Sequence, residues 1–155
     1  MTAAYALESL AKIGSGDRVL IHAGTGGVGQ AAIQIAQRAG AQVFATASQG
    51  KWQILKDLGV KHIFDSRTTE FESAINQLTD GKGVDIVLNS LAGEFTDASL
   101  RLLKPGGRFL EIGITDLRTP DQIEQISPGI KCFPIDLMDL YRDERALLQT
   151  LLQAL

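Results

Sequence analysis

Residues 18 to 29 read RVLIHAGTGGVG, and this stretch decides the fold. It opens with a short β-rich run, continues with glycines in the spacing G-x-G-x-x-G, and enters a helical pattern of apolar residues at Val28. In this context the three glycines are typical of a loop that binds the pyrophosphate of a dinucleotide. Gly24 permits the tight turn, Gly26 lets the backbone approach the phosphates, and Gly29 allows the helix to pack closely on the strand. The free N–H groups at the helix N-terminus favour an anion there.

Outward from this loop, short apolar runs and helical patterns alternate along the chain. Further strands are predicted at 43–45, 62–64, 84–88, 108–113 and 132–137, and helices at 28–39, 52–58, 71–78, 95–103 and from about 142. This alternation with near-continuous apolar strands predicts a parallel sheet covered by helices on both faces. Residues 1–155 are therefore interpreted as one α/β domain, a doubly wound six-stranded parallel sheet of the Rossmann fold.

Composition limits the classes of function. The chain has 155 residues, 45% hydrophobic and 21% charged, which suits a single globular domain with a real core. A net charge of −3, with no basic run longer than a pair, argues against generic binding to nucleic acid or anionic membranes. The first residues show no basic segment followed by an apolar run, and no apolar stretch approaches the ~18 residues of a spanning helix, so we expect neither a secretory signal nor a membrane span. The single Cys132 excludes an internal disulfide and a cysteine-cluster zinc site, so we expect a cytoplasmic domain without a metal.

The end of the second predicted strand indicates which dinucleotide binds. An NAD site usually carries Asp or Glu about 20 residues beyond the glycine loop, to hold the ribose 2′-OH. Residues 45–51 read ATASQGK, without a carboxylate, whereas Ser48 offers a hydroxyl and Lys51 an ammonium, and Arg67 follows the third strand. A 2′-phosphate needs donors and positive charge. We predict NADPH rather than NADH; the alternative interpretation of the two basic residues is solvated surface charge.

Longer stretches resemble a known family. They are VLIHAGTGGVGQAAIQIAQRAGAQVFATAS (19–48), Ser66-Arg67, VDIVLNSLAGE (84–94) and LLKPGGRFLEIG (102–113). Together they resemble the enoyl reductase domain of modular polyketide synthases, one of the zinc-independent medium-chain reductases that also include quinone reductases. LNSLAGE, with the following DASL (97–100), is much more specific than the glycine loop. The resemblance implies that NADPH gives hydride to the β-carbon of an α,β-unsaturated thioester on an acyl carrier protein, within a polyketide synthase module.

The resemblance also implies roles for individual residues around the cofactor. The glycine loop, which comprises Gly24, Thr25, Gly26, Gly27, Val28 and Gly29, would bind the pyrophosphate, and the 2′-phosphate would contact Ser48, Lys51 and Arg67. The nicotinamide ribose would lie against Asn89, Ser90 and Leu91, and the nicotinamide end would meet Ile112 and Gly113. Asn89 and Ser90 have an alternative and compatible role as helix N-caps.

The reaction also requires a proton donor. Addition of hydride to the β-carbon leaves an enolate, and a general acid must then protonate the α-carbon of that enolate. In the family, a lysine just after the glycine of strand five and an aspartate on strand six are candidates. Asp136 matches the aspartate, with a plain surface carboxylate as its alternative interpretation. Ile114 occupies the lysine position and cannot donate a proton, so the chain departs from the family there.

The second departure is the substrate-binding lobe of the family, which precedes this stretch and is absent from the chain. We expect the isolated chain to bind NADPH and to be inactive or nearly so.

The alternative functions are a quinone-reductase-like NADPH oxidoreductase for small substrates and a non-catalytic NADPH-binding module. An adenosylmethionine methyltransferase is disfavoured by Ser48 and by the glycine loop. Without prompt protonation, the enolate of a substrate that carries an internal leaving group would expel that group and close a ring. Pairing of two copies along the edge strand would give a homodimer.

Overall fold

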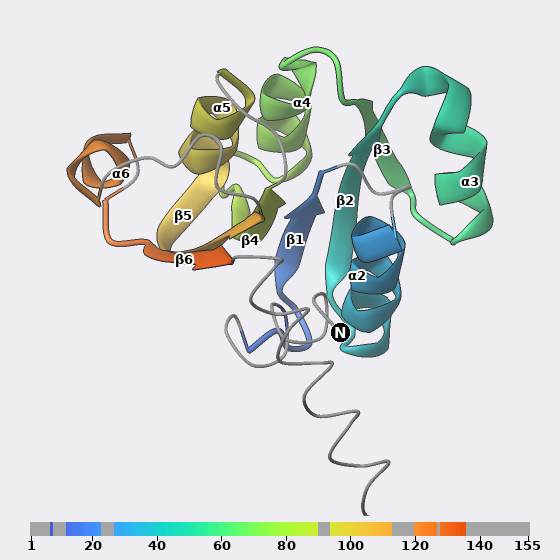
Figure 1. Ribbon diagram of the computed structural model, residues 1–155, viewed down its shortest axis with the longest axis horizontal. Helices are drawn as coiled ribbons and strands as arrows, with labels where there is room; N and C mark the ends of the chain where they lie inside the picture. Colours follow the sequence, from blue (N-terminus) through green and yellow to red (C-terminus); the bar gives the residue numbers. More distant parts are fainter. Residues whose placement is uncertain are drawn as a thin grey trace, which may run out of the picture.

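Strands and helices alternate throughout the part of the chain that the computed structural model describes, which comprises Leu7 and residues 12–22, 27–89, 94–112, 120–126 and 128–135 (Figure 1). The strands are β1 (Arg18–Ile21), β2 (Gln42–Ala47), β3 (His62–Asp65), β4 (Val84–Asn89), β5 (Leu103–Ile112) and β6 (Lys131–Ile135). The helices are α2 (Gly27–Arg38), the 3-10 turn η2 (Gln49–Lys51), α3 (Trp52–Asp57), α4 (Glu70–Leu78), α5 (Glu94–Leu102) and α6 (Pro120–Ile126).

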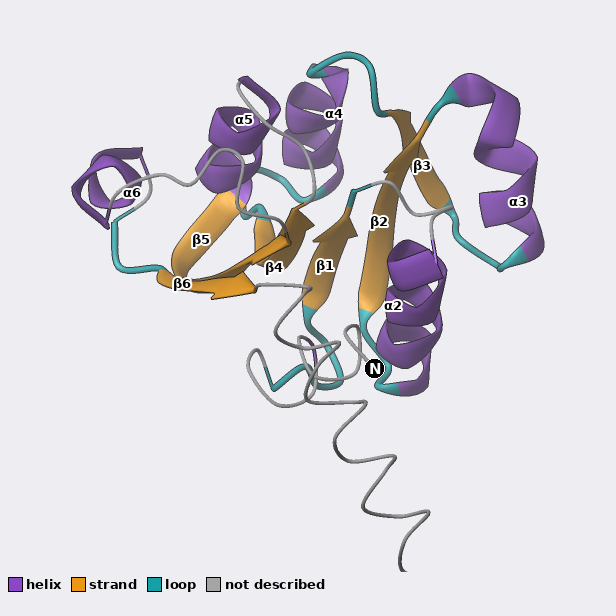
Figure 2. Cartoon of the chain, viewed as in Figure 1, coloured by secondary structure: helices purple, strands orange, loops and turns teal. Residues whose placement is uncertain are grey.

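The six strands form one parallel sheet in the order β3-β2-β1-β4-β5-β6 (Figure 2). This is the doubly wound order, with the direction of winding reversed between β1 and β4. The predicted α/β fold with a six-stranded parallel sheet is confirmed.

Two hydrophobic cores, one on each face of the sheet, hold the helices in place. Side chains alternate across a strand, so Val19 and Ile21 of β1 face one core while Leu20 between them faces the other. The first core is completed by α2 and α3, with Ile33 and Leu55 fully buried. The second is completed by α4, α5 and α6, which lie on the opposite face of the sheet. Burial on both faces explains why the strands read as continuous apolar runs.

Strand β5 begins earlier than predicted. Leu103 pairs with Val84 and Arg108 with Ile86, so that residues 104–107 of β5 stand opposite Asp85 alone. These residues, KPGG, form a bulge within the strand, whereas the sequence predicted a helix to residue 103 and a strand only from 108. A Cβ on Gly107 would lie 2.9 Å from the Lys104 carbonyl oxygen, so the bulge depends on a glycine there.

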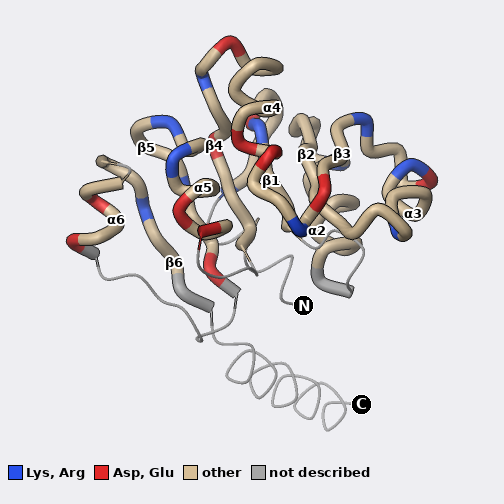
Figure 3. The backbone as a smooth tube through the Cα atoms, turned by 90° about the horizontal axis from the view of Figure 1, so that it is seen from above, with Lys and Arg blue, Asp and Glu red and all other residues tan. Residues whose placement is uncertain are grey.

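The short helix α6 was not predicted. Its apolar residues are few; among its described side chains Ile123 is buried in the second core, and Ile126 is partly buried against that core. The predicted helix from about residue 142 lies outside the described residues. Lys, Arg, Asp and Glu are interspersed over the helices and turns of the described part (Figure 3).

Candidate cofactor-binding site

The reversal of winding at β1 and β4 creates the place where this fold class binds its ligands. Ligands lie in the crevice beyond the carboxyl ends of the two strands at this point. The His22 amide donates to the Leu88 carbonyl at 3.1 Å, so the β1–β4 pairing continues to the rim of the sheet. Helix α2 follows β1 and starts at Gly27, with no acidic side chain in its first turn and with Gly29 buried. The fold therefore presents a helix N-terminus free of repelling carboxylates beside the predicted pyrophosphate loop.

The buried His22 side chain lies beneath this rim and makes two hydrogen bonds that hold neighbouring elements together. Its Nδ1 lies 2.9 Å from the Thr46 hydroxyl and its Nε2 lies 2.6 Å from the Ser99 hydroxyl. Because Ser99 donates its proton to the Phe95 carbonyl at 2.7 Å, it accepts from Nε2–H, and Thr46 donates to Nδ1. Burial lowers the pKa of His22 to about 3, which keeps the ring neutral. His22 therefore has a core role: it ties β1 to β2 and α5 just before the glycine loop.

The turns after β2 and β3 meet at the Ala47 carbonyl. Ala47 and Asp65 are register partners at the carboxyl ends of the two strands. The Ser66 amide donates to the Ala47 carbonyl at 3.1 Å, and the Trp52 indole N–H donates to the same oxygen at 2.9 Å. The structure thus brings the segment after β2 and the segment after β3, which are far apart in the sequence, to one stretch of rim.

The three residues predicted to contact a 2′-phosphate lie on these two turns. Ser48 is half-buried with an extended backbone, and Lys51 and Arg67 are exposed. The Arg67 amide donates to the Asp65 carboxylate at 2.9 Å, which caps the turn after β3. A hydroxyl and two cations on adjacent turns suit a dianion better than they suit a ribose 2′-OH. Contact with a 2′-phosphate itself stays a prediction.

A buried polar cluster lies at the carboxyl ends of β4 and β5. The Asn89 side-chain amide donates to the Glu111 carboxylate at 2.9 Å and to the Thr96 hydroxyl at 3.2 Å. All three residues are buried, and Asn89 and Glu111 are register partners. The cluster fixes the two strand ends relative to each other and to α5. In the sequence these strand ends are followed by Ser90 and Leu91, predicted to line the nicotinamide ribose, and by Gly113, predicted to meet the nicotinamide end.

Sequence reasoning did not single out Glu111. The available signal was a carboxylate within the otherwise apolar run FLEI at the end of a buried strand, where an unpaired charge is costly. Its negative charge also reaches β6. Although Cys132 is an exposed residue, partial burial of the thiol and, second, the Glu111 carboxylate raise the pKa of that thiol. Cys132 is thereby kept in its less reactive form.

Several of the predicted site residues are not among those that the structure describes. They are Gly24, Thr25, Gly26, Ser90, Leu91, Gly113, Ile114 and Asp136. Gly27 and Val28 open α2, and Ile112 ends β5. Their roles as pyrophosphate, ribose, nicotinamide and proton-donor positions stay predictions.

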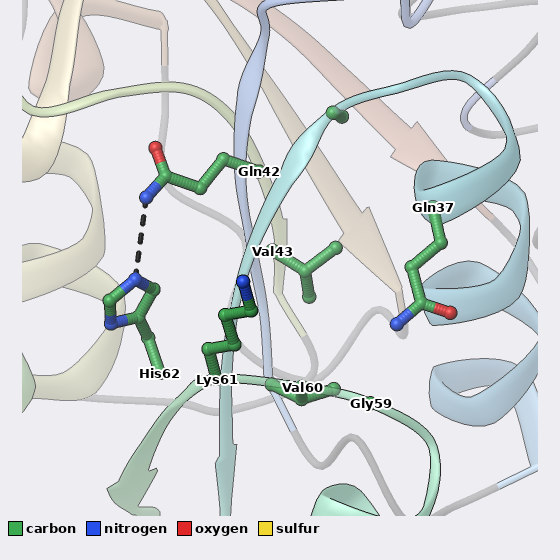
Figure 4. Close-up of a pocket in the computed structure, with 8 residues that line it drawn as sticks. Gln37, Gln42, Val43, Gly59, Val60, Lys61 and His62 are labelled. Carbon is green, nitrogen blue, oxygen red and sulfur yellow. Dashed lines mark hydrogen bonds between the residues drawn. The ribbon is translucent and has the colours of Figure 1, made fainter.

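A separate pocket of about 270 Å³ lies at the other end of the sheet (Figure 4). It opens near the amino ends of β2 and β3, and its wall includes the Gln42 amide, which lies 3.3 Å from the His62 ring. Its lining residues are Gln37, Ala41, Gln42, Val43, Gly59, Val60, Lys61 and His62. Because ligands of this fold class bind at the carboxyl ends, this pocket is distinct from the predicted cofactor site.

The zinc-binding dehydrogenase family matches residues 27–153. Within the described ranges, no group of three or more His, Cys, Asp or Glu side chains is placed to hold a metal ion. The described part of the chain therefore does not fit the zinc of the family description. None of the described helices is both long and apolar enough to cross a membrane.

Known polyketide synthases and their reductase domains are similar to the chain. Mycoketide-CoA synthase of Mycobacterium tuberculosis is 57% identical over 140 residues, which cover 89% of this chain and 3% of the synthase. The CurK enoyl reductase superposes with a TM-score of 0.87 at 48% identity over 99% of this chain and 48% of that one. The CurF ER cyclopropanase from the curacin A biosynthetic pathway has the same score and identity over 92% of this chain and 43% of its own.

One solved structure has nearly the same extent as this chain. The nucleotide-binding subdomain of the enoylreductase domain of PpsC from Mycobacterium tuberculosis superposes with a TM-score of 0.82 at 40% identity, over 98% of this chain and 89% of that one. The present chain spans a few per cent of the synthase and about half of the complete reductase CurK. It belongs to the zinc-binding dehydrogenase family and constitutes the nucleotide-binding half of a polyketide synthase enoyl reductase domain.

Proposed function

We propose that this chain binds NADPH across the carboxyl rim of its sheet, with the 2′-phosphate on the two turns that meet at the Ala47 carbonyl. The observation that carries the proposal is this junction, because it sets the Ser48–Lys51 turn beside Arg67. The absence of a carboxylate from residues 45–51 supports the same assignment, since a 2′-phosphate would be repelled by one. Kinship with polyketide synthase enoyl reductases supports a pyridine nucleotide as the ligand.

The wider activity that we propose is reduction of an α,β-unsaturated acyl thioester carried by an acyl carrier protein, in the cytoplasm and within a polyketide synthase module. When bound, NADPH supplies the hydride for the β-carbon. The α-carbon must then receive a proton, for which Asp136 is the candidate donor in this chain because Ile114 has no proton to give. The rest of the reductase supplies the acyl pocket, so the isolated chain binds the cofactor without turning over a substrate.

Titration of the chain with NADPH and NADH by isothermal titration calorimetry tests the cofactor assignment. We expect NADPH to bind roughly tenfold tighter or more, since a charge-assisted hydrogen bond adds about 1.5–3 kcal/mol. Adenosylmethionine serves as the third ligand and should produce no binding heat. Equal affinity for NADPH and NADH would refute the 2′-phosphate site, and tighter binding of adenosylmethionine would refute the reductase assignment.

Ring closure is the second candidate activity, favoured by Ile114 and by the likeness to the CurF ER cyclopropanase. Hydride addition to the β-carbon of a γ-halogenated enoyl thioester leaves an enolate. Its α-carbon can displace the halide, forming a Cα–Cγ bond and releasing a halide ion, if no proton arrives first. Incubation of the complete reductase with NADPH and this substrate distinguishes the two activities: a cyclopropyl thioester supports ring closure, and an exclusively reduced, uncyclised product contradicts it.

Among the strands that the structure describes, β6 is the outermost on its side of the sheet, and its Lys131 and Cys132 are exposed. An unpaired strand edge can pair with a second copy of itself. We therefore propose a homodimer through β6 in the complete reductase. Sedimentation of the complete reductase tests it, with Cys132→Pro as the variant that blocks strand pairing and is expected to give monomers.

A further inference from the structure

The Ala47 carbonyl accepts two hydrogen bonds from outside the sheet ladder. The Trp52 indole N–H donates to it at 2.9 Å, and the Ser66 amide donates at 3.1 Å. Ala47 is buried at the last position of β2. Trp52 therefore folds back over the turn that it ends, and it shares its acceptor with the first residue after β3.

Both turns are further held by local hydrogen bonds. In the turn after β2, the Lys51 amide donates to the Ser48 carbonyl at 2.9 Å, closing the 3-10 turn between them. In the turn after β3, the Arg67 amide donates to the Asp65 carboxylate at 2.9 Å. Each turn is internally closed, so the Ala47 carbonyl, with Trp52 on one side and Ser66 on the other, sets their relative position.

We propose that Trp52 is a positioning residue that sets the preference of this site for a 2′-phosphorylated dinucleotide. Its indole N–H holds the turn that carries Lys51 against the turn that carries Arg67, so that both cations contact the same dianion. The inference rests on the proposed NADPH site and adds a residue that touches the scaffold rather than the phosphate. Because Coulomb attraction and charge-assisted hydrogen bonds both weaken with distance, a small separation of the turns lowers affinity for the 2′-phosphate selectively.

The two functions of the Trp52 side chain can be separated by substitution. Its ring is partly buried against the core formed with α2 and α3, while its N–H makes the bond to Ala47. Trp52→Phe keeps an aromatic ring in that place and deletes the donor. One neutral hydrogen bond contributes about 0.5–1.5 kcal/mol, so we expect the NADPH affinity to fall roughly three- to tenfold and the NADH affinity to change less than twofold.

Gln37→Met provides the matched control. The Gln37 side chain also donates to a backbone carbonyl, that of Leu58, at 2.9 Å, but at the opposite end of the sheet. Both variants lose one bond of the same kind, so both are expected to unfold at slightly lower temperature. The ratio of NADH to NADPH dissociation constants, measured by calorimetry, should fall in Trp52→Phe alone. A merely structural role for Trp52 would lower the unfolding temperature and leave that ratio at its wild-type value.

Trp52 is the single tryptophan of the chain, and its fluorescence gives a second measurement without any mutation. The oxidised cofactors do not absorb where tryptophan emits, so a change on binding reports the surroundings of the indole itself. At equal occupancy we expect NADP⁺ to alter the emission of Trp52 more than NAD⁺ does, and equal changes would contradict the inference. A wild-type preference for NADPH that Trp52→Phe retains overturns the inference alone; a wild-type chain without the preference overturns the proposed site and the inference together.

Discussion

The Asn89 side-chain amide donates to the Glu111 carboxylate at 2.9 Å, and both residues are buried at the carboxyl ends of adjacent strands. This bond joins two segments that are 22 residues apart in the sequence and that both lead toward the predicted nicotinamide side of the site. A buried carboxylate is costly unless it is hydrogen-bonded, so the amide is part of what allows Glu111 to lie there.

Replacing Asn89 with aspartate should therefore destabilise the fold more than the similar size of the two side chains suggests. Asn89→Asp substitutes a second carboxylate for the donor, and we expect the free energy of unfolding at neutral pH to fall by about 3 kcal/mol. Two facing carboxylates raise the pKa of one of them in the folded state, so the loss should shrink as the pH falls and that group is protonated. Urea denaturation between pH 7.5 and 5 measures this, with Asn89→Ala, which removes the donor without adding a charge, as the control whose deficit should shrink less over the same range.

The buried neutral His22 makes the protein sensitive to acid. Its pKa of about 3 in the folded chain lies below the ordinary value of 6.5, so the unfolded chain binds the extra proton. Stability is fully present above pH 6.5 and is lost as the pH falls toward 3, by about 1.4 kcal/mol per pH unit. His22→Gln cannot titrate, so the advantage of the wild type over this variant at pH 7.5 should diminish steadily below pH 6.5 in urea denaturation. Parallel stability profiles for the two proteins would rule out a neutral buried His22.

Gly83 is required by a contact with another element rather than by its own turn alone. A Cβ on Gly83 would collide with the Leu102 carbonyl oxygen, and the residue has a φ of +74°. Gly81 has a similar φ of +78° but open space around the position of its Cβ, so Gly81→Ala is the matched control. We expect Gly83→Ala to lower the free energy of unfolding by about 2 kcal/mol more than Gly81→Ala does. Equal losses in urea denaturation would mean that backbone strain, and not the contact with Leu102, decides the residue type.

The cations at the predicted 2′-phosphate site should act on one cofactor only. In the double variant Lys51→Ala/Arg67→Ala we expect NADPH to bind roughly ten- to a hundredfold more weakly and NADH to bind almost as before, because only NADPH carries the additional phosphate. Arg38→Ala/Lys61→Ala removes the same two residue types from exposed positions elsewhere on the chain and should leave both affinities unchanged. Calorimetric titrations of the two double variants distinguish a phosphate site from solvated surface charge. Equal loss of NADPH and NADH affinity in Lys51→Ala/Arg67→Ala would contradict the assignment of the two residues to a 2′-phosphate site.

Ile114 is the position at which a substitution should change the outcome of the reaction. Ile114→Lys in the complete reductase introduces an amine at the position that the family resemblance assigns to a lysine. We expect faster protonation of the enolate and a larger share of simple reduction over ring closure with a γ-halogenated substrate. Product analysis by mass spectrometry measures that share. Unaltered turnover and product would show that this position has no part in proton delivery here.

Much of the fold was predictable because it is coded by local patterns. The period of apolar residues in 18–22 and 28–39, with the glycines between them, is sufficient to predict a strand, a loop and a helix. The same reasoning was wrong at the start of β5, because the bulge at residues 104–107 follows from pairing with β4 and from the close approach that Gly107 permits. Helix α6 was missed because its contact with the core rests largely on one buried side chain, Ile123.

The fold class, the glycine loop and the charge at the ends of the second and third strands could be predicted from the sequence, since each depends on residues that are near neighbours in the chain. The bonds that hold these parts together are visible only in the folded chain: the Ala47 carbonyl shared by Trp52 and Ser66, and the buried bond from Asn89 to Glu111. Such bonds join residues whose proximity results from strand order and register, and no local pattern contains that information. The physical reason is that a buried polar group takes its partner from whichever element the sheet places beside it.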